Sequence, residues 1–128
     1  MPTPTNIRIL YVDDDFDSRE LISFMLSKEN KTYNVTTASS AGKAEKLINK
    51  EPFHLYILDY CLPSRSGIQL CRRIREKDQK TPVLFYSAMT RQVDREIAIK
   101  AGANGYLIKP NEFEELPKKV SQLLNNGE

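Results

Sequence analysis

Short apolar runs alternate along this chain with longer segments in which apolar residues recur at helical spacing. The runs are rich in Ile, Val, Leu and Tyr, and few polar residues interrupt them, which is typical of strands buried on both faces of a parallel sheet. They cover residues 7–12, 33–37, 55–58, 83–86 and 106–108. The pattern therefore predicts five short strands.

The segments that follow these runs carry apolar residues three or four positions apart, which predicts amphipathic helices. The apolar positions are Leu21, Ile22, Met25 and Leu26, then Ala41, Ala44, Leu47 and Ile48, then Ile68, Cys71 and Ile74, then Val93, Ile97 and Ala101, and last Phe113, Leu116, Val120, Leu123 and Leu124. We expect the first helix to open with the capping pattern at residues 17–20, and the second near Ser39 or Ser40. The fourth should end at Gly102. Pro117 should kink the last helix or delay its start, because proline lacks a backbone donor.

Strands that alternate with helices predict an α/β fold in which right-handed crossovers place helices on both faces of a parallel sheet. The 128 residues suffice for one domain that buries its own core without a disulfide or a zinc ion. We assign residues 6–125 to this domain, residues 1–5 to a flexible tail, and residues 126–128 to a second tail or the start of a linker.

The composition and charge of the chain argue against several classes of function. The formal net charge is only +2 at pH 7, and the densest basic group alternates with apolar positions, which predicts the solvated side of a helix. That group comprises Arg72, Arg73, Arg75, Lys77 and Lys80. Cys61 and Cys71 lie ten residues apart, which fits neither a zinc site nor a disulfide framework. Without a signal sequence or a long apolar run, the chain is predicted to be cytoplasmic and to contact neither membrane nor nucleic acid.

Residues that directly follow the predicted strands carry the candidate chemistry, because open parallel sheets bind ligands beyond the carboxyl ends of their strands. Three aspartates, residues 13–15, follow the first strand, and Asp59 follows the third. Ser87 follows the fourth strand and Lys109 the fifth. Each residue alone could be a turn former, a helix cap or a solvated charge. Their convergence favours a shared site, with Asp15 facing outward at the entry to the first helix.

Carboxylates gathered in one crevice would repel one another without a cation, and each would raise the pKa of its neighbours. Mg²⁺ prefers oxygen ligands and keeps positions for water or phosphate oxygens, so the cluster predicts a magnesium site. A lysine and a hydroxyl beside the ion are suited to hold the other oxygens of a phosphoryl group. A carboxylate can itself be the nucleophile in such a transfer and form an aspartyl phosphate.

Four motifs in order resemble the receiver domain of bacterial two-component response regulators, over nearly the whole chain. The segment ILYVDDD resembles the first strand and acidic pair of that family, at Asp13 and Asp14. The segment LYILDYCLPSRSG resembles its phosphoacceptor loop, with Asp59 as the acceptor, Pro63 four residues on and Gly67 eight residues on.

Two further motifs complete the resemblance. The segment FYSA matches the family's hydroxyl position followed by alanine, here Ser87 and Ala88. The segment AGANGYLIKP matches the aromatic switch position at Tyr106 and the Lys-Pro pair at Lys109 and Pro110, whose peptide bond is cis in the family. The resemblance implies a flavodoxin-like, doubly wound fold with five parallel strands in the order 2-1-3-4-5 and five helices.

By the same resemblance, Asp59 accepts a phosphoryl group from the phosphohistidine of a histidine kinase or of a phosphotransfer protein. The cofactor would be Mg²⁺, for which Mn²⁺ can substitute. Asp14 and Asp59 would bind the ion through their carboxylates. Asp13 would act mostly through water, and Cys61 would contribute only its backbone carbonyl.

The resemblance also implies a switch. Lys109 would pair with one phosphoryl oxygen, and Ser87 would move toward another, which vacates space into which Tyr106 can rotate. The face formed by the fourth helix, fifth strand and fifth helix would then change for an unknown downstream protein. Cys61 and Met89, two residues beyond the acceptor and the hydroxyl, offer no acid or amide to orient water, so the phosphorylated state should not be unusually short-lived.

Other functions fit these residues less well. A magnesium-dependent phosphatase with an aspartate nucleophile needs a second acid two residues later, where Cys61 stands. A flavin or nucleotide carrier needs a phosphate loop after the first strand, where three carboxylates would repel the phosphate. A stand-alone interaction module without phosphorylation is the other alternative. The only histidine, His54, is expected to be a partly exposed polar residue and not a phosphorelay group.

Overall fold

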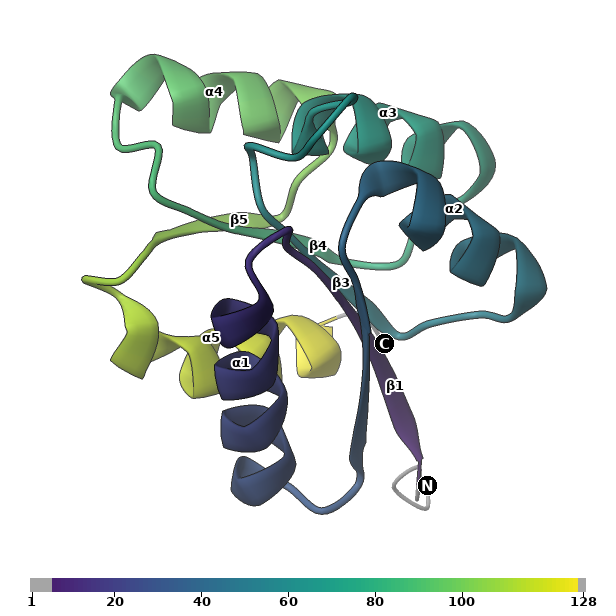
Figure 1. Ribbon diagram of the computed structural model, residues 1–128, viewed down its shortest axis with the longest axis vertical. Helices are drawn as coiled ribbons and strands as arrows, with labels where there is room; N and C mark the ends of the chain where they lie inside the picture. The colour runs from purple at the N-terminus through teal and green to yellow at the C-terminus, as the bar shows by residue number, and fades with distance from the viewer. Residues whose placement is uncertain (1–5, 127–128) are drawn as a thin grey trace.

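The computed structural model describes residues 6–126, in which a five-stranded parallel sheet lies between two layers of helices (Figure 1). The strands are β1 (Ile7–Val12), β2 (Tyr33–Ala38), β3 (Leu55–Leu58), β4 (Val83–Ser87) and β5 (Gly105–Ile108). The helices are α1 (Phe16–Glu29), α2 (Ala41–Lys50), α3 (Gly67–Lys77), α4 (Gln92–Ala101) and α5 (Leu116–Asn126), and a 3₁₀ turn, η1 (Phe113–Glu115), precedes α5. The strand order β2-β1-β3-β4-β5 confirms the predicted flavodoxin-like fold.

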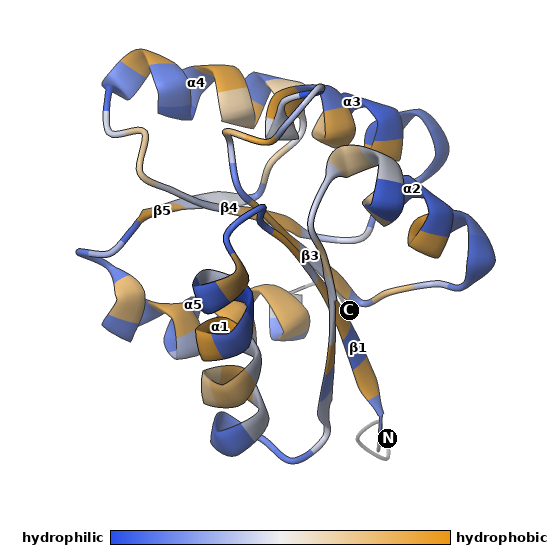
Figure 2. Cartoon of the chain, viewed as in Figure 1, coloured by the Kyte–Doolittle hydropathy of each residue, from blue (hydrophilic) through white to orange (hydrophobic). Residues whose placement is uncertain are grey.

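The helices cover the sheet on both faces. Helices α1 and α5 lie against one face, and α2, α3 and α4 lie against the other (Figure 1). Because successive residues of a strand point to opposite faces, strands that are apolar at every position supply two cores. Leu10, Val12 and Phe85 belong to one core, and Ile9 and Tyr11 to the other. Figure 2 shows apolar residues along β1 and β3 and a mixture of apolar and polar residues along the helices.

The first helix begins earlier than the predicted capping pattern at residues 17–20. The carboxylate of Asp15 accepts a hydrogen bond from the backbone N–H of Ser18 at 2.9 Å, so Asp15 caps α1 and Asp17 lies in the first turn. The side chain of Ser40 caps α2, as expected. Gly102 ends α4 with a positive φ of 117°, as expected of a glycine at this position.

Two residues of the predicted apolar stripes face solvent instead. Leu21 is 53% exposed, because α1 packs on the sheet through Ile22 and Leu26. Val93 is 46% exposed, because α4 turns other positions toward its neighbours. These exposed positions correct the predicted core faces of both helices.

The start of the last helix matches the second of the two outcomes predicted for its proline. Phe113 lies in η1 and not in α5, and Pro117 is the second residue of α5. Proline is tolerated in the first turn of a helix because the backbone N–H that it lacks would have no helical partner there. The helix is therefore delayed.

The prediction that the basic group of α3 faces solvent is wrong for Arg75, which lies partly buried against neighbouring loops. Its guanidinium donates hydrogen bonds to the backbone carbonyls of Asp78, Thr81 and Gly102, at 2.8 to 3.0 Å. The side chain therefore ties the end of α3 to the loops before β4 and β5. The other arginines and lysines of the group are exposed, as predicted.

Three smaller points complete the fold. His54 is exposed, as predicted, and its Nδ1 accepts a hydrogen bond from the backbone N–H of Arg8 at 2.9 Å. Within residues 6–126, no helix is long and apolar enough to cross a membrane. The two predicted tails lie outside the described residues, apart from Asn126, the last residue of α5.

Candidate functional site

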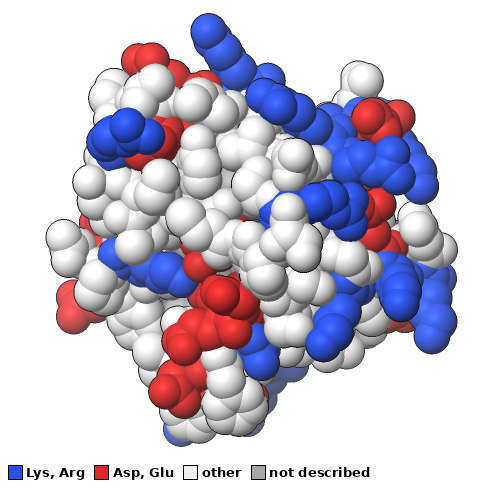
Figure 3. Space-filling model, turned by 45° about the horizontal axis from the view of Figure 1, so that its top comes forward, with Lys and Arg blue, Asp and Glu red and all other residues white. Residues whose placement is uncertain are grey.

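Four strand ends bring polar side chains together at the carboxyl edge of the sheet. Asp13 follows β1, Asp59 follows β3, Ser87 ends β4 and Lys109 follows β5. Strands β1 and β3 pair in register, and the backbone N–H of Asp59 donates to the carbonyl of Val12 at 2.9 Å. The first two acids therefore lie side by side. In Figure 3, acidic side chains form a patch near the middle of the view.

Lys109 joins the two buried acids. Its Nζ lies 2.7 Å from an oxygen of Asp13 and 2.7 Å from an oxygen of Asp59. Burial alone would lower the pKa of Lys109, but hydrogen bonds and charges from both carboxylates outweigh burial and raise the pKa. The ammonium therefore stays protonated at neutral pH. The Lys109–Pro110 peptide bond is cis, as the resemblance implied.

Asp59 is buried, with 5% of its surface exposed. One carboxylate oxygen accepts the ammonium of Lys109, and the other accepts the backbone N–H of Cys61 at 3.3 Å. Burial raises the pKa of Asp59 above its ordinary value, although Lys109 opposes the rise and the negative charge of Asp13 adds to it. A further cation nearby would stabilise the ionised form of the Asp59 carboxylate.

Asp13 is fully buried, and its carboxylate is already held by three donors. The hydroxyl of Tyr11 donates at 2.5 Å and the backbone N–H of Asp15 at 2.9 Å, in addition to Lys109. Sequence reasoning did not identify Tyr11 as part of the site. A signal was present, because residues two apart on a strand share a face. Burial, together with Asp13, raises the pKa of the Tyr11 phenol.

Asp14 differs from Asp13 because it is exposed to solvent. One carboxylate oxygen from each of Asp13, Asp14 and Asp59 lies within 4.8 Å of the other two, so the three residues could share a metal ion. Hard oxygen ligands of this kind suit Mg²⁺. The donor set therefore fits the predicted ion.

Cys61 contributes no activated thiol to the site. Although the Cys61 side chain is exposed, partial desolvation raises the pKa of its thiol, and the charge of Asp59 adds to the rise, while Lys109 opposes it. A thiol with a raised pKa is a poor nucleophile and a poor redox sensor at neutral pH. Cys71, by contrast, is buried in the core as expected.

The hydroxyls of Ser87 and Tyr106 both form hydrogen bonds to the backbone of Met89. The Oγ of Ser87 accepts the backbone N–H of Met89 at 3.2 Å, and the hydroxyl of Tyr106 donates to the carbonyl of Met89 at 2.7 Å. The ring of Tyr106 stacks on Phe85 with 6.0 Å between centroids, and Tyr60 meets it edge-on at 6.5 Å. Sequence reasoning did not foresee the aromatic packing that holds Tyr106 inward.

The sequence is similar to proteins of one family. The family described as the response regulator receiver domain matches residues 9–121. An uncharacterised 14.6 kDa protein of Leptolyngbya boryana is 38% identical over 124 residues, which cover 95% of this chain and 93% of that protein. The response regulator ArlR of Staphylococcus epidermidis is 34% identical over 116 residues, which cover 91% of this chain and 52% of ArlR. The chain thus spans nearly all of the first relative and about half of the second.

Solved structures are similar over nearly the whole chain. The response regulator TrrA of Thermotoga maritima, in complex with Mg²⁺-BeF, superposes with a TM-score of 0.82 and 32% sequence identity. The match covers 91% of this chain and 98% of TrrA. The two proteins therefore share one fold over nearly the whole of each chain.

Proposed function

Because the chain belongs to the response regulator receiver domain family of two-component signalling, we propose that it accepts a phosphoryl group on Asp59 and changes its α4–β5–α5 face in response. One observation carries this proposal. The Lys109 ammonium lies 2.7 Å from a carboxylate oxygen of both Asp13 and Asp59. A lysine held there would neutralise the Asp59 carboxylate before the transfer. The same ammonium would then lie close to the negative charge of the phosphoryl group that Asp59 receives.

In the transfer, an oxygen of the Asp59 carboxylate would form a bond to phosphorus as the bond from phosphorus to the donor histidine nitrogen breaks. Lys109 would then pair with one phosphoryl oxygen and Ser87 with another. The metal ligands would be Asp13, Asp14, Asp59 and the backbone carbonyl of Cys61. When bound, Mg²⁺ or Mn²⁺ would neutralise charge on the phosphoryl oxygens. The three donors on Asp13 support a contact through water for that residue.

Ser87 and Tyr106 would form the switch. Because the Ser87 hydroxyl and the Tyr106 hydroxyl both bond to the backbone of Met89, movement of Ser87 toward a phosphoryl oxygen would disturb the contact that holds Tyr106. Tyr106 lies on β5, so its movement would alter the α4–β5–α5 face. A two-state packing change of this kind converts a local charge into a signal for another protein.

The same proposal implies two kinds of partner. A histidine kinase or a phosphotransfer protein would donate the phosphoryl group to residues 6–125, the proposed receiver domain, and a downstream protein would bind the α4–β5–α5 face. TrrA, a similar response regulator, was solved in complex with Mg²⁺-BeF, which supports magnesium as the cofactor. An interaction module without phosphorylation is the alternative, and a phosphorylation experiment separates the two.

The test is to incubate the protein with acetyl phosphate and Mg²⁺ and to measure the intact mass. The wild type should gain one phosphoryl group, and chelation of the metal should prevent the gain. Asp59→Asn should gain none, whereas Asp15→Asn should behave as the wild type, because asparagine caps a helix as well as aspartate does.

Stable incorporation in Asp59→Asn would contradict the assignment of the acceptor. A folded wild type that gains no mass would favour the interaction module. Continuous turnover of varied phosphate esters would favour a phosphatase.

A further inference from the structure

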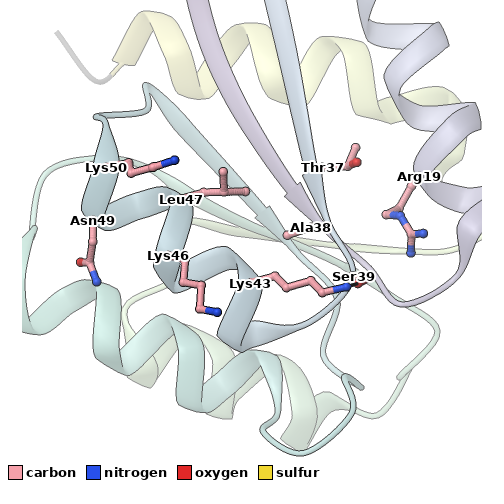
Figure 4. Close-up of a pocket in the computed structure, with 9 residues that line it drawn as sticks. All are labelled: Arg19, Thr37, Ala38, Ser39, Lys43, Lys46, Leu47, Asn49 and Lys50. Atoms are coloured by element: carbon pink, nitrogen blue, oxygen red, sulfur yellow. Dashed lines mark hydrogen bonds between the residues drawn. The ribbon is translucent and has the colours of Figure 1, made fainter.

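A basic groove opens at the edge of the sheet, between α1, the end of β2 and α2 (Figure 4). Its volume is about 790 Å³, within the range of roughly 300–1,000 Å³ that is usual for small-molecule sites. Its charged lining residues are Arg19, Lys43, Lys46 and Lys50. Every charge on the groove wall is therefore positive, although the net charge of the chain is only +2.

The folding pattern leaves these cations without acidic partners. The three lysines of α2 recur at spacings of three and four residues, so they share one side of the helix. The carboxylates nearest in sequence point to other partners: Glu45 pairs with Arg65 and Arg73, and Glu51 pairs with Arg8. Among residues 6–126, none of the four groove cations forms an ion pair.

Two of the cations are held in place at one end of the groove. Nη1 of Arg19 donates to the backbone carbonyl of Asp13 at 2.8 Å, and the guanidinium lies 5.7 Å from the ring centre of Phe16. Nζ of Lys43 donates to the hydroxyl of Ser39 at 3.1 Å. Figure 4 shows both side chains near Ser39, from opposite walls of the groove. Ordering these side chains in advance lowers the entropy that a ligand must overcome.

We propose that this groove binds a small molecule that carries two or more phosphate groups. The guanidinium of Arg19 has further N–H donors beyond the one used on Asp13, and a planar fork of this kind suits phosphate oxygens. The lysines farther along α2 give a second phosphate its own counter-charge, and Leu47 with Ala38 gives the organic part an apolar contact. The groove adjoins the acidic cluster, since Arg19 and Ala38 both bond to the backbone of Asp13, but it shares no lining residue with the cluster and does not depend on phosphorylation of Asp59.

The test is a titration of the metal-free protein with inorganic pyrophosphate at low ionic strength, monitored by amide chemical shifts. We expect saturable binding with shifts concentrated in residues 37–50 and at Arg19. The double variant Lys43→Gln/Lys46→Gln should bind about tenfold more weakly. The matched control Lys28→Gln/Lys100→Gln removes two exposed lysines from α1 and α4 and should change the affinity by less than about twofold.

Each other outcome would overturn the proposal. An equal loss in the control would show unspecific attraction between charges, and shifts confined to the acidic cluster would show the wrong site. Orthophosphate that binds as tightly as pyrophosphate would contradict a requirement for two phosphates. Duplex DNA that binds through the same lysines more tightly than pyrophosphate would make the groove part of a nucleic-acid surface. Far-ultraviolet circular dichroism of both double variants would establish that they are folded.

Discussion

Gly67 opens α3 directly against the backbone of the proposed phosphoacceptor. A methyl group on its Cα would lie 2.0 Å from the carbonyl oxygen of Asp59 and 3.1 Å from the ring of Phe85. The backbone N–H of Gly67 also donates to the carbonyl of Tyr60 at 2.8 Å. Because the nearest atom belongs to the backbone, it cannot turn aside as a flexible side chain would.

Gly67→Ala should therefore lower the free energy of unfolding by about 1–3 kcal/mol, the usual cost of an overpacked site. Gly42→Ala is the matched control, since a Cβ there would meet only the end of the Arg65 side chain, at 3.9 Å. Alanine favours helix over glycine by about 1 kcal/mol, so Gly42→Ala should be neutral or stabilising. Urea denaturation of both variants measures the difference, and equal stabilities would contradict the predicted clash.

Cys61 bears on the lifetime of the proposed aspartyl phosphate. Its side chain is exposed beside Asp59, and a thiol with a raised pKa cannot direct an attacking water. Cys61→Gln would place an amide there and should speed dephosphorylation by about tenfold, a small part of what a well-placed catalytic group provides. Cys61→Ala, which adds no such group, should leave the half-life close to that of the wild type. Intact mass after removal of the phosphodonor gives the half-lives, and a Gln variant no faster than the Ala variant would refute the prediction.

At the scale of single residues, the sequence reveals which residues come after a strand but not which atoms their side chains contact. Asp59 and Lys109 could be predicted because their positions after apolar runs are visible in the chain. The bond from Tyr11 to Asp13 and the bond from Arg19 to the Asp13 carbonyl could not be, since both depend on where side chains meet in space. The proposed roles of the site residues stay predictions until phosphorylation is measured.

At the scale of elements, the spacing of apolar residues predicts where a helix lies better than it predicts which residues of that helix are buried. The predicted stripe on α1 includes Leu21, but the helix turns Ile22 and Leu26 toward the sheet. Residues at the margin of a stripe are buried only if a neighbouring element reaches them. The sequence of a helix does not contain that information.

Asp78 ends α3 and holds the loop before β4. Its carboxylate accepts the backbone N–H of Lys80 and of Thr81, at 2.9 and 3.0 Å, and also the hydroxyl of Thr81. Burial would raise the pKa of Asp78, but the bonds from Thr81 and Lys80 and the charge of Arg75 outweigh it and lower the pKa below its ordinary value. The ionised carboxylate therefore stabilises the folded state.

Asp78→Asn should lower the free energy of unfolding at pH 7 by about 1–2 kcal/mol, the order expected for hydrogen bonds to a charged group. A carboxyl whose pKa is lower in the folded state stabilises the fold above its unfolded pKa of about 3.9 and ceases to do so as the pH falls through the folded value. The difference in free energy of unfolding between the wild type and Asp78→Asn should therefore shrink as the pH falls from the unfolded pKa of Asp78 through its folded pKa. Glu20→Gln, on the exposed side of α1, should show no such gap. Urea denaturation across pH measures both, and a gap that widened in acid would contradict the assignment.

At the scale of the whole molecule, the alternation of apolar runs and helices was enough to predict a parallel sheet covered on both faces. Every strand residue from Leu55 to Leu58 is buried, as a run without polar positions implies. The order of the strands came from the family resemblance. The strand order cannot be obtained from hydrophobic periodicity, because the spacing of apolar residues does not determine toward which edge of the sheet each crossover runs.

A bound divalent ion should stabilise the entire fold, because an ion that binds only the folded chain shifts the equilibrium by mass action. At a Mg²⁺ concentration about 100-fold above the dissociation constant, the free energy of unfolding should rise by about 2.7 kcal/mol. Asp14→Asn should lose most of this gain, while Asp15→Asn should keep it. Without Mg²⁺, Asp14→Asn should be no less stable than the wild type, because one of three neighbouring carboxylates is gone. Denaturation with and without Mg²⁺ tests this, and an undiminished gain in Asp14→Asn would remove that residue from the metal site.

The bond between Lys109 and Asp13 joins residues that are 96 positions apart in the chain. During translation the acidic residues leave the ribosome early, but the ammonium that neutralises them emerges only with the last strand. A nascent chain thus carries the proposed acceptor without the lysine that is proposed to prepare it. Competence to receive a signal would then coincide with completion of the sheet, so that unfinished copies do not draw phosphoryl groups away from finished ones.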